Sequence, residues 1–284
     1  MGFTVHGRTV LITGAARGMG RLYAERAVRE GAAAVVLWDV DGGALENAVV
    51  GLTSRASAVH SYVVDVASVE SIRSAASAVL NDVGVPDLLI NNAGIVRGKY
   101  FWEHDHHADI ELTLQVNTAG PMHIARAFLP AMMERGTPAR ILNVASASGT
   151  LSVPRMSVYA ASKWAVIGWS DSLRLELASL KHPIAVTTLI PSYIRTGMFE
   201  GARGPLLTPL MEPDDVVDKA WRAMLAGRAR VQLPWTVQLA GTLRNLLPQP
   251  IWDVVAGRIF KVYSSMDHFT GRPSGAPPRK KGDR

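Results

Sequence analysis

Three residues in the middle of the chain have side chains and spacings suited to proton transfer: Ser146, Tyr159 and Lys163. Tyr159 and Lys163 are four positions apart in the stretch AASKWAVIGWSDSLRLEL and its flank, whose pattern predicts a helix, so both side chains should lie on one helical face. An ammonium close to a phenol stabilises the phenolate, and we expect the pKa of Tyr159 to fall from about 10 towards neutrality. Such a tyrosine can accept or release a proton near neutral pH.

Ser146 follows an apolar run, ARILNVAS, that predicts a strand, and it precedes Tyr159 by thirteen positions. Its hydroxyl could hold the oxygen of an alcohol or a carbonyl group. Ser148 is an alternative, because two positions along a continued strand place a side chain on the same face. Periodicity alone does not choose between the two serines.

A second motif near the N-terminus predicts the redox partner of this site. The run RTVLITGAARGMG contains an apolar strand followed by Gly14, Gly18 and Gly20, and RLYAERAVREG then predicts a helix. Glycines between a strand and a helix let the backbone approach a pyrophosphate, which the N-terminus of the helix attracts. The chain should therefore bind a dinucleotide.

Asp39 ends the second predicted strand, in VVLWDVD, nineteen positions after Gly20. A carboxylate there accepts hydrogen bonds from the adenosine ribose and repels a 2′-phosphate, which favours NAD over NADP. Arg17 is the opposing signal, because a cation in the glycine loop could pair with that phosphate. Asp39 could instead form a turn, as we expect of Asp41.

With the motif NNAG at residues 91–94, these features make the chain resemble the short-chain dehydrogenase/reductase family from about Gly7 to Leu233. The resemblance implies an NAD-dependent oxidoreductase acting on CH–OH donors. VLWDVD and the apolar C-terminal segment ending in MDHF resemble the branch that acts on retinoids, steroids and long-chain alcohols, which implies a lipophilic alcohol or carbonyl substrate. It also implies a homodimer or homotetramer that pairs through the predicted helix 157–180 and its neighbour.

The resemblance also assigns roles to single residues. It implies that Asn117 joins Ser146, Tyr159 and Lys163 in a catalytic tetrad by holding a water that connects Lys163 to solvent; a solvent-facing asparagine within a helix is the alternative. Asp65 either contacts the adenine with Val66 or belongs to a helix cap. IPSYIRTGM resembles a Pro-Gly-x-x-x-Thr element in which Ser192 replaces the glycine. Serine tolerates fewer backbone conformations than glycine, so the resemblance does not carry over the backbone contact of position 192 with the cofactor. The residues expected to contact the cofactor are Gly14, Arg17, Gly18, Met19, Gly20, Asp39, Asp65, Val66, Asn92, Ala93, Gly94, Tyr159, Lys163, Pro191, Ile194 and Thr196.

The elements that must position these residues alternate along the chain, which predicts an α/β fold with a doubly wound, parallel, Rossmann-like sheet. Strands are expected at 9–13, 33–38, 58–64, 88–91, 140–145, 184–190 and 230–233. Helices are expected near 19–30, 43–52, 68–82, 106–117, 120–135, 157–180 and 214–226. Every motif falls at the carboxyl end of a strand, where ligands bind in such sheets.

We divide the chain into a dinucleotide-binding and catalytic domain (1–233), a helical extension (234–270) and a basic, disordered tail (271–284). The extension contains two apolar-periodic stretches separated by Pro248 and Pro250. We expect it to pack on its own domain or on another subunit. The alternative is an amphipathic lid that meets membranes or lipid substrates.

The charge of the chain gives little support to nucleic-acid binding. Of the net +6, the final stretch RPSGAPPRKKGDR carries five basic residues against one acidic residue, or +4, which leaves +2 for residues 1–271. Such a tail is typical of a solvated, disordered segment. No metal site is predicted, because His104, His106 and His107 lie in a polar stretch and are expected at the surface.

The chain has no cysteine, no apolar signal core and no run long enough to span a bilayer. We therefore expect a cytoplasmic protein with at most a weak peripheral contact with membranes. Two other functions stay open: an NADPH-linked carbonyl reductase, supported by Arg17, and a catalytically idle NAD-binding protein that docks on membranes through its extension and tail.

Overall fold

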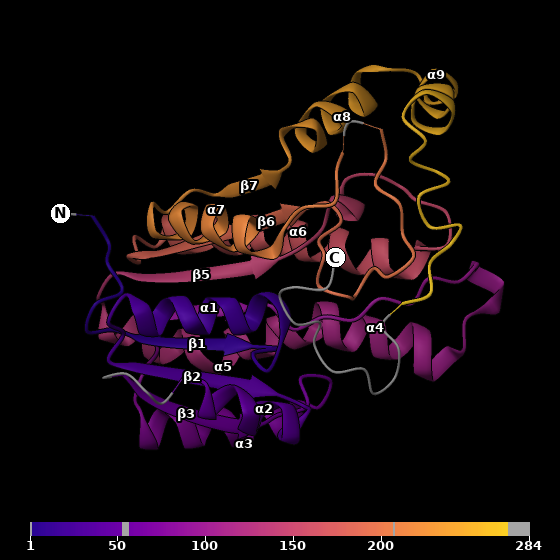
Figure 1. Cartoon of the computed structure of the whole chain (residues 1–284). Helices are drawn as coiled ribbons and strands as arrows, with labels where there is room; N and C mark the ends of the chain where they lie inside the picture. Colours follow the sequence, from indigo (N-terminus) through magenta and orange to yellow (C-terminus); the bar gives the residue numbers. More distant parts are fainter. Residues whose placement is uncertain (1, 53–56, 207, 272–284) are drawn as a thin grey trace.

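The computed structural model describes residues 2–52, 57–206 and 208–271 (Figure 1). Seven parallel strands form one sheet in the order β3-β2-β1-β4-β5-β6-β7. They are β1 (Thr9–Thr13), β2 (Ala34–Asp39), β3 (Ala58–Val63), β4 (Leu88–Asn91), β5 (Ala139–Val144), β6 (Ile184–Pro191) and β7 (Arg230–Leu233). The predicted fold class is confirmed, and each predicted strand end lies within one residue of the observed end.

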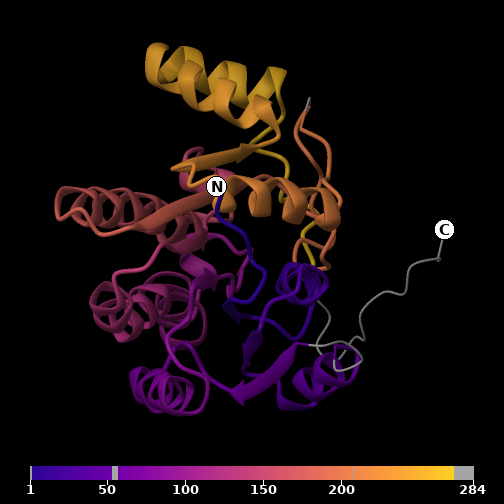
Figure 2. The ribbon, with the colours of Figure 1, turned by 90° about the vertical axis from the view of Figure 1, so that its left-hand side faces the viewer.

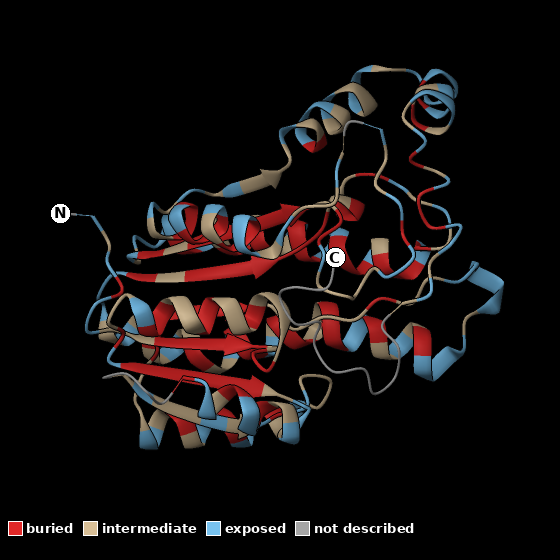
Figure 3. Cartoon of the chain, viewed as in Figure 1, coloured by how far each residue is buried: buried red, intermediate tan, exposed pale blue. Residues whose placement is uncertain are grey.

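The central strands are apolar along their whole length because helices cover both of their faces. Ile12 of β1, for example, is fully buried and aligns with Leu37 of β2 on one side and Ile90 of β4 on the other. Figure 3 shows this continuous burial along the middle strands. Between β1 and β4 the strand order reverses, and such a reversal opens a crevice at the carboxyl ends of the strands.

Helices cover both faces of the sheet (Figure 2). On one face, α1 (Gly18–Arg29), α2 (Gly42–Val50) and α7 (Pro213–Leu225) share a core in which Tyr23 stacks on Trp221. The opposite face carries α3 (Val69–Asp82), α5 (Gly120–Arg135) and α6 (Ser157–Ser179), with Trp38 packed against Phe128.

The helical path from residue 106 to residue 135 differs from the predicted pair of helices, because it runs without a break. The π-helices η2 (His106–Glu111) and η3 (Gln115–Ala119) flank a single α-helical turn, α4 (Leu112–Leu114), and lead directly into α5. Pro121 lacks the N–H that an α-helix would direct at the carbonyl of Asn117, so a wider turn forms here. Asn117 therefore lies within a π-helical turn.

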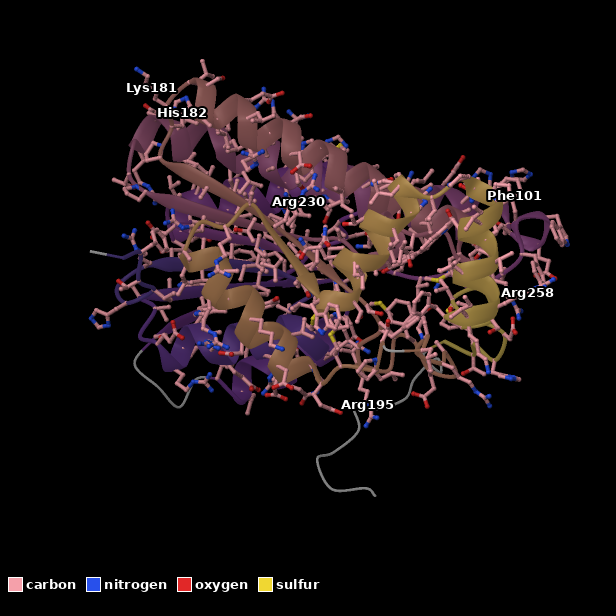
Figure 4. All side chains as sticks on the ribbon, turned by 90° about the horizontal axis from the view of Figure 1, so that it is seen from above. Phe101, Lys181, His182, Arg195, Arg230 and Arg258 are labelled. Carbon is pink, nitrogen blue, oxygen red and sulfur yellow. The ribbon has the colours of Figure 1, made fainter. Side chains whose placement is uncertain are left out.

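The C-terminal extension lies beyond the carboxyl end of the sheet (Figure 1). It contains α8 (Trp235–Leu246), α9 (Gln249–Val254) and the π-helix η5 (Val255–Ile259). Leu151 of the main domain packs with Trp252, Ala256 and Val262 in one core cluster. In Figure 4, Phe101 and Arg258 lie at one end of the molecule and Lys181 and His182 at the other. The extension thus covers the end of the sheet at which the motifs lie.

The predicted disordered tail lies, apart from Gly271, outside the described residues. Among the helices of the described part of the chain, none has the length and hydropathy needed to cross a bilayer.

Candidate active site

The glycine loop joins β1 to α1 by a turn that requires glycine at defined places. Gly14 has a φ of 63°, a conformation that other residues rarely adopt. A Cβ on Gly20 would overlap the carbonyl oxygen of Gly14, so only glycine lets α1 approach the loop this closely. No side chain caps the first turn of α1. Its N–H groups are therefore available to an anion such as a pyrophosphate.

The carboxylate of Asp39 is fixed at the end of β2 beside this loop. Its two oxygens accept hydrogen bonds from the backbone N–H groups of Ala16, at 3.0 Å, and Asp41, at 3.1 Å. The guanidinium of Arg17 pairs with the carboxylate of Asp41. A hydrogen bond from the Ala44 N–H and the charge of Arg17 both act to lower the pKa of Asp41, against the small opposing effect of burial, and the pKa is lowered overall. Arg17 is thus engaged by an acidic residue of its own chain.

The NNAG motif ties the end of β4 to the end of β1. Asn92 Nδ2 donates to the carbonyl oxygens of Thr13, at 3.0 Å, and Gly14, at 3.2 Å. The Thr13 hydroxyl accepts from the backbone N–H groups of Asn92 and Ala93, both at 3.0 Å. The motif thereby holds the glycine loop in place.

Asp65 does not cap α3, because that role falls to Ser68, whose hydroxyl accepts from the Ser71 N–H at 3.2 Å. Asp65 instead forms a turn with the Ala67 N–H, at 2.9 Å, and its side chain lies at the wall of the crevice with Val66.

A groove runs along the carboxyl ends of the strands from Asp39 to Tyr159. Of the sixteen residues predicted to contact the cofactor, all except Gly20 line this groove; Gly20 lies behind Gly14. An uncapped helix N-terminus, a fixed carboxylate beyond it and a buried lysine at the far end fit the pyrophosphate, the ribose and the nicotinamide ribose of a dinucleotide.

Tyr159 and Lys163 lie in the first turns of α6 with only 4% of each residue exposed. Lys163 Nζ donates to the Val144 carbonyl at 2.9 Å and lies 5.8 Å from the centre of the Tyr159 ring. Burial raises the pKa of Tyr159 to about 12, against a hydrogen bond with Ser146 that acts to lower it. Burial also lowers the pKa of Lys163 to about 8.

The predicted fall in the pKa of Tyr159 is therefore wrong for the protein without ligands. Desolvation of the phenolate is the largest cause of the rise, and the ammonium of Lys163 is directed at the Val144 carbonyl instead of the phenol.

The two candidate serines occupy different places. Ser146 follows the end of β5 by two positions, interacts with Tyr159 and lines the groove. Ser148 lines the apolar pocket but not the groove, and its hydroxyl lies 3.9 Å from Met156 Sδ. The backbone N–H of Ser148 donates to Ser146 Oγ at 3.2 Å, which orients the Ser146 hydroxyl.

Asn117 is buried, so the alternative of a solvent-facing asparagine is wrong. Its side chain exchanges hydrogen bonds with the backbone of Ile95, at 2.8 and 2.9 Å, and donates to the Ser162 hydroxyl at 3.1 Å. These contacts anchor the loop after NNAG to α6. Asn117 does not line the groove, but a Cβ on Gly94 would lie between its Oδ1, at 3.2 Å, and Lys163 Nζ, at 3.5 Å.

Ser192, at the glycine position of the resembled element, is accommodated without strain. Its φ is not among the positive values found in the described part of the chain, and its N–H donates to the Leu233 carbonyl at 2.8 Å. Pro191, Ile194 and Thr196 line the groove, and Thr196 lies beside Gly18.

The sequence profile described as short chain dehydrogenase matches residues 8–205 of this chain. The chain belongs to the short-chain dehydrogenase family. Human estradiol 17-beta-dehydrogenase 11 is 34% identical over 90% of this chain and 84% of that protein. Human epidermal retinol dehydrogenase 2 is 35% identical over 93% and 86%, and retinol dehydrogenase 10-A of Danio rerio is 35% identical over 86% and 80%. The predicted resemblance to the steroid and retinoid branch is thus confirmed by the names of these relatives.

Solved structures of the family support the fold and the nucleotide groove. A short-chain dehydrogenase/reductase from Burkholderia phymatum, in complex with NAD, has a TM-score of 0.79 and 29% identity over 86% of this chain and 95% of that one. A metagenomic short-chain oxidoreductase in complex with NADP has a TM-score of 0.68 and 28% identity over 80% and 96%. This dehydrogenase therefore carries the fold of proteins that bind a nicotinamide dinucleotide.

A second, apolar pocket meets the groove at Ser146, Ser192 and Phe199, which line both. About 880 Å³ of space without protein atoms lies within its walls, the open solvent at its mouth included. No local sequence pattern marks the residues of this pocket, several of which belong to the loop after Thr196 and to the extension. The walls include Leu151, Tyr193, Phe199, Trp235, Leu239, Leu243, Trp252, Phe260 and Val262.

The expectation of three surface histidines is wrong for His104, whose side chain is fully buried. Its Nδ1 lies 3.8 Å from the carboxylate of Asp109, which also pairs with Lys99 at 2.6 Å and Arg97 at 3.3 Å. Within the described ranges, no three His, Asp or Glu side chains are grouped so as to hold a metal ion.

Proposed function

We propose that this short-chain dehydrogenase transfers a hydride between NAD and the carbon of a lipophilic alcohol or the corresponding carbonyl compound. The meeting of the groove and the apolar pocket at Ser146 carries the proposal. A substrate whose apolar part fills the pocket would place its oxygen beside Ser146 and Tyr159, facing the nicotinamide end of the groove. The nicotinamide supplies the hydride acceptor.

In this proposal Tyr159 takes the hydroxyl proton and Ser146 donates to the charge that develops on the substrate oxygen. Lys163, held by the Val144 carbonyl, stabilises the phenolate once the proton has left, because its charge acts in a buried site. We assign to Asn117 the holding of a water near Lys163, as the family resemblance implies, because its Oδ1 and Lys163 Nζ would lie 3.2 and 3.5 Å from a Cβ on Gly94. Exchanging Tyr159 for Phe tests these roles.

We infer NAD rather than NADP as the cofactor. A 2′-phosphate at the end of β2 would meet the carboxylates of both Asp39 and Asp41, and Arg17 is already paired with Asp41. The alternative of an NADPH-linked carbonyl reductase requires Arg17 to exchange this partner for the phosphate. Initial rates with NAD and NADP at a saturating alcohol distinguish the two, since a preference for NADP would contradict the inference.

The substrate class follows from the pocket and from the relatives. The pocket walls are mainly apolar, and relatives at 34–35% identity are named for estradiol and retinol. We propose a steroid-like, retinoid-like or long-chain alcohol as substrate. A panel of such alcohols with NAD, followed by the absorbance of NADH, tests this. Activity confined to small polar sugars would contradict it.

We also propose that the protein is cytoplasmic and makes a weak peripheral contact with membranes near the pocket. Trp235 is 71% exposed at the pocket, and Leu206 and Leu239 are exposed beside it. A lipid surface touching them would deliver an apolar substrate directly.

Flotation with phosphatidylcholine and phosphatidylserine vesicles, with and without residues 234–284, tests the membrane contact. Sedimentation tests the predicted dimer or tetramer. If the wild type oxidised none of these alcohols while flotation persisted, the idle membrane-docking protein would be the better description.

A further inference from the structure

The last described part of the chain, residues 260–271, lies against the loop of residues 198–206 that borders the apolar pocket. We call residues 260–271 the C-terminal clamp. Neither segment forms a helix or a strand. Backbone hydrogen bonds join them: Arg203 N to Ser265 O (2.9 Å), Leu206 N to Phe260 O (2.8 Å), Thr270 N to Glu200 O (3.0 Å) and Gly271 N to Glu200 O (3.3 Å). These bonds fix one irregular segment against the other.

The clamp also fits closely against two glycines of the main domain. A Cβ on Gly201, whose φ is 80°, would overlap the carbonyl oxygen of His268. A Cβ on Gly98 would overlap the ring of Phe269. Met266 is fully buried between these contacts. The clamp is therefore packed against the main domain.

Inside the clamp, a chain of hydrogen bonds reaches the wall of the pocket. The Ser265 hydroxyl donates its proton to the Val262 carbonyl at 2.7 Å. The bond of 2.8 Å between Tyr193 and Ser265 therefore runs from the phenol to the serine oxygen. Tyr193 and Val262 both line the apolar pocket, whereas Ser265 does not. Ser265 thus connects two residues of the pocket wall, Tyr193 and Val262, by hydrogen bonds on the side away from the pocket.

Tyr193 is connected in turn to the reaction site by an aromatic contact. The ring of Phe199 packs edge-to-face against Tyr193, at 5.3 Å between ring centres, and against Tyr159, at 6.0 Å. Phe199 lines both the groove and the pocket. A shift of Tyr193 would displace Phe199, because this geometry leaves no gap between the rings.

We propose that Ser265 is a positioning residue that sets substrate specificity: through Tyr193, the C-terminal clamp holds the pocket wall in the shape that receives a bulky apolar substrate. The proposal rests on the proposed function, in that the apolar pocket is taken to bind the alcohol. A substrate that fills the pocket depends on this wall, whereas a small alcohol that reaches only Ser146 and Tyr159 does not.

The first test measures the clamp without any turnover, by hydrogen exchange of the full-length protein. We expect Ser265→Ala to speed exchange in residues 199–206 about fivefold, the usual effect of losing one net hydrogen bond. Gly201→Ala should have a larger effect, because its Cβ displaces His268. The matched control is Gly7→Ala, which has a similar φ of 72° but no atom within 4 Å of the added carbon. Unchanged exchange in both clamp variants would overturn the proposal.

The second test measures specificity with decan-2-ol and propan-2-ol at saturating NAD. Ser265→Ala should raise the KM for decan-2-ol about fivefold and leave kcat and KM for propan-2-ol within about twofold. Tyr193→Phe should act on decan-2-ol similarly, and the double variant should be no worse than either, because the two side chains form one bond. An equal effect on both alcohols, or additive effects, would overturn the role of the pair.

A third measurement separates failure of this proposal from failure of the proposed function. If the wild type oxidised no alcohol, the apolar fluorescent probe 8-anilinonaphthalene-1-sulfonate would replace the substrate. Weaker binding of the probe to Ser265→Ala than to the wild type and Gly7→Ala would support the clamp as the support of the pocket wall, even with the enzymatic proposal rejected. Equal binding would reject the clamp as well.

Discussion

Lys163 shares one face of α6 with Tyr159, yet its ammonium donates to the Val144 carbonyl, 2.9 Å away, and lies 5.8 Å from the centre of the Tyr159 ring. Both side chains are buried in the protein without ligands. Burial lowers the pKa of Lys163 to about 8 and raises that of Tyr159 to about 12. The site therefore holds an ionisable pair that the fold alone does not favour in its charged form, as functional sites often do.

We expect Lys163→Met to stabilise the protein near pH 7 while abolishing activity. The folded-state pKa of Lys163, about 8, lies below its ordinary value of 10.5, a shift that corresponds to about 3 kcal/mol. The loss of the hydrogen bond to Val144 costs about 1 kcal/mol, so about 2 kcal/mol of net gain is expected. Urea unfolding at pH 7 measures it, and a variant less stable than the wild type would contradict it.

The pH dependence of the same pair has a definite sign. Between about pH 8 and 10.5 the unfolded chain keeps the proton of Lys163 and the folded protein does not, so wild-type stability rises with pH in this window. Lys163→Met lacks this contribution, and its advantage should shrink from pH 7.5 to pH 9.5. Above about pH 10 the unfolded chain loses the phenol proton of Tyr159 while the folded protein keeps it, so this residue lowers stability as the pH rises. The comparison therefore stops below pH 10. An advantage that stays constant over the window would exclude Lys163 as its source.

Tyr159→Phe should retain cofactor binding and lose turnover. The ring and its contact with Phe199 persist, while the proton acceptor is removed, and general acid–base catalysis typically contributes about 10²–10⁴ in rate. NADH fluorescence measures binding, and stopped assays with an active alcohol measure kcat. Gly241→Ala serves as the control, because Gly241 lines neither the groove nor the apolar pocket and has no atom within 4 Å of an added carbon, so NADH binding and kcat should both stay intact. A kcat near the wild-type value in Tyr159→Phe would remove Tyr159 from the mechanism.

Cofactor preference should respond to the two carboxylates beside the glycine loop. Asp39→Asn removes the negative charge and replaces one of the two acceptor oxygens with an NH₂ donor, and we expect the preference for NAD over NADP in kcat/KM to fall about tenfold. Adding Asp41→Asn releases Arg17 from its partner and should favour NADP further, since a free guanidinium pairs well with a phosphate. If the double variant kept the preference of the wild type, Asp39 and Asp41 would not determine it.

The sequence was sufficient to predict the sheet and the cofactor groove, because both depend on local patterns. The apolar run of β1 is itself the buried strand, and the glycine motif and the asparagine motif each follow a strand directly. The order of these motifs along a parallel sheet brings them to one edge. Fifteen of the sixteen predicted cofactor residues consequently line a single groove.

Features that depend on packing between distant segments could not be predicted in this way. Ser265 contacts Tyr193 across 72 positions, and no local signal marks that pair. In the extension, a 3.6-residue period would place Ile259 on the same face as the buried Trp252. The wider turn of the π-helix η5 changes this register, and Ile259 is exposed. His104 is buried beside Asp109 of the following π-helix, whose carboxylate also pairs with Lys99 and Arg97, and no local pattern marks this cluster.

The close packing of Gly20 behind Gly14 gives the last prediction, for Gly20→Ala. The added Cβ would overlap the Gly14 carbonyl, and the backbone of the glycine loop must move away from α1 to relieve it. We expect NAD binding to weaken at least about tenfold, because the loop and the helix N-terminus hold the pyrophosphate together. Isothermal titration with NAD measures this. Gly241→Ala is the matched control, since Gly241 also lies in a helix but has no atom within 4 Å of an added carbon. It should bind NAD normally and gain up to about 1 kcal/mol of stability from helix propensity. Normal NAD binding by Gly20→Ala would mean that the loop does not hold the cofactor.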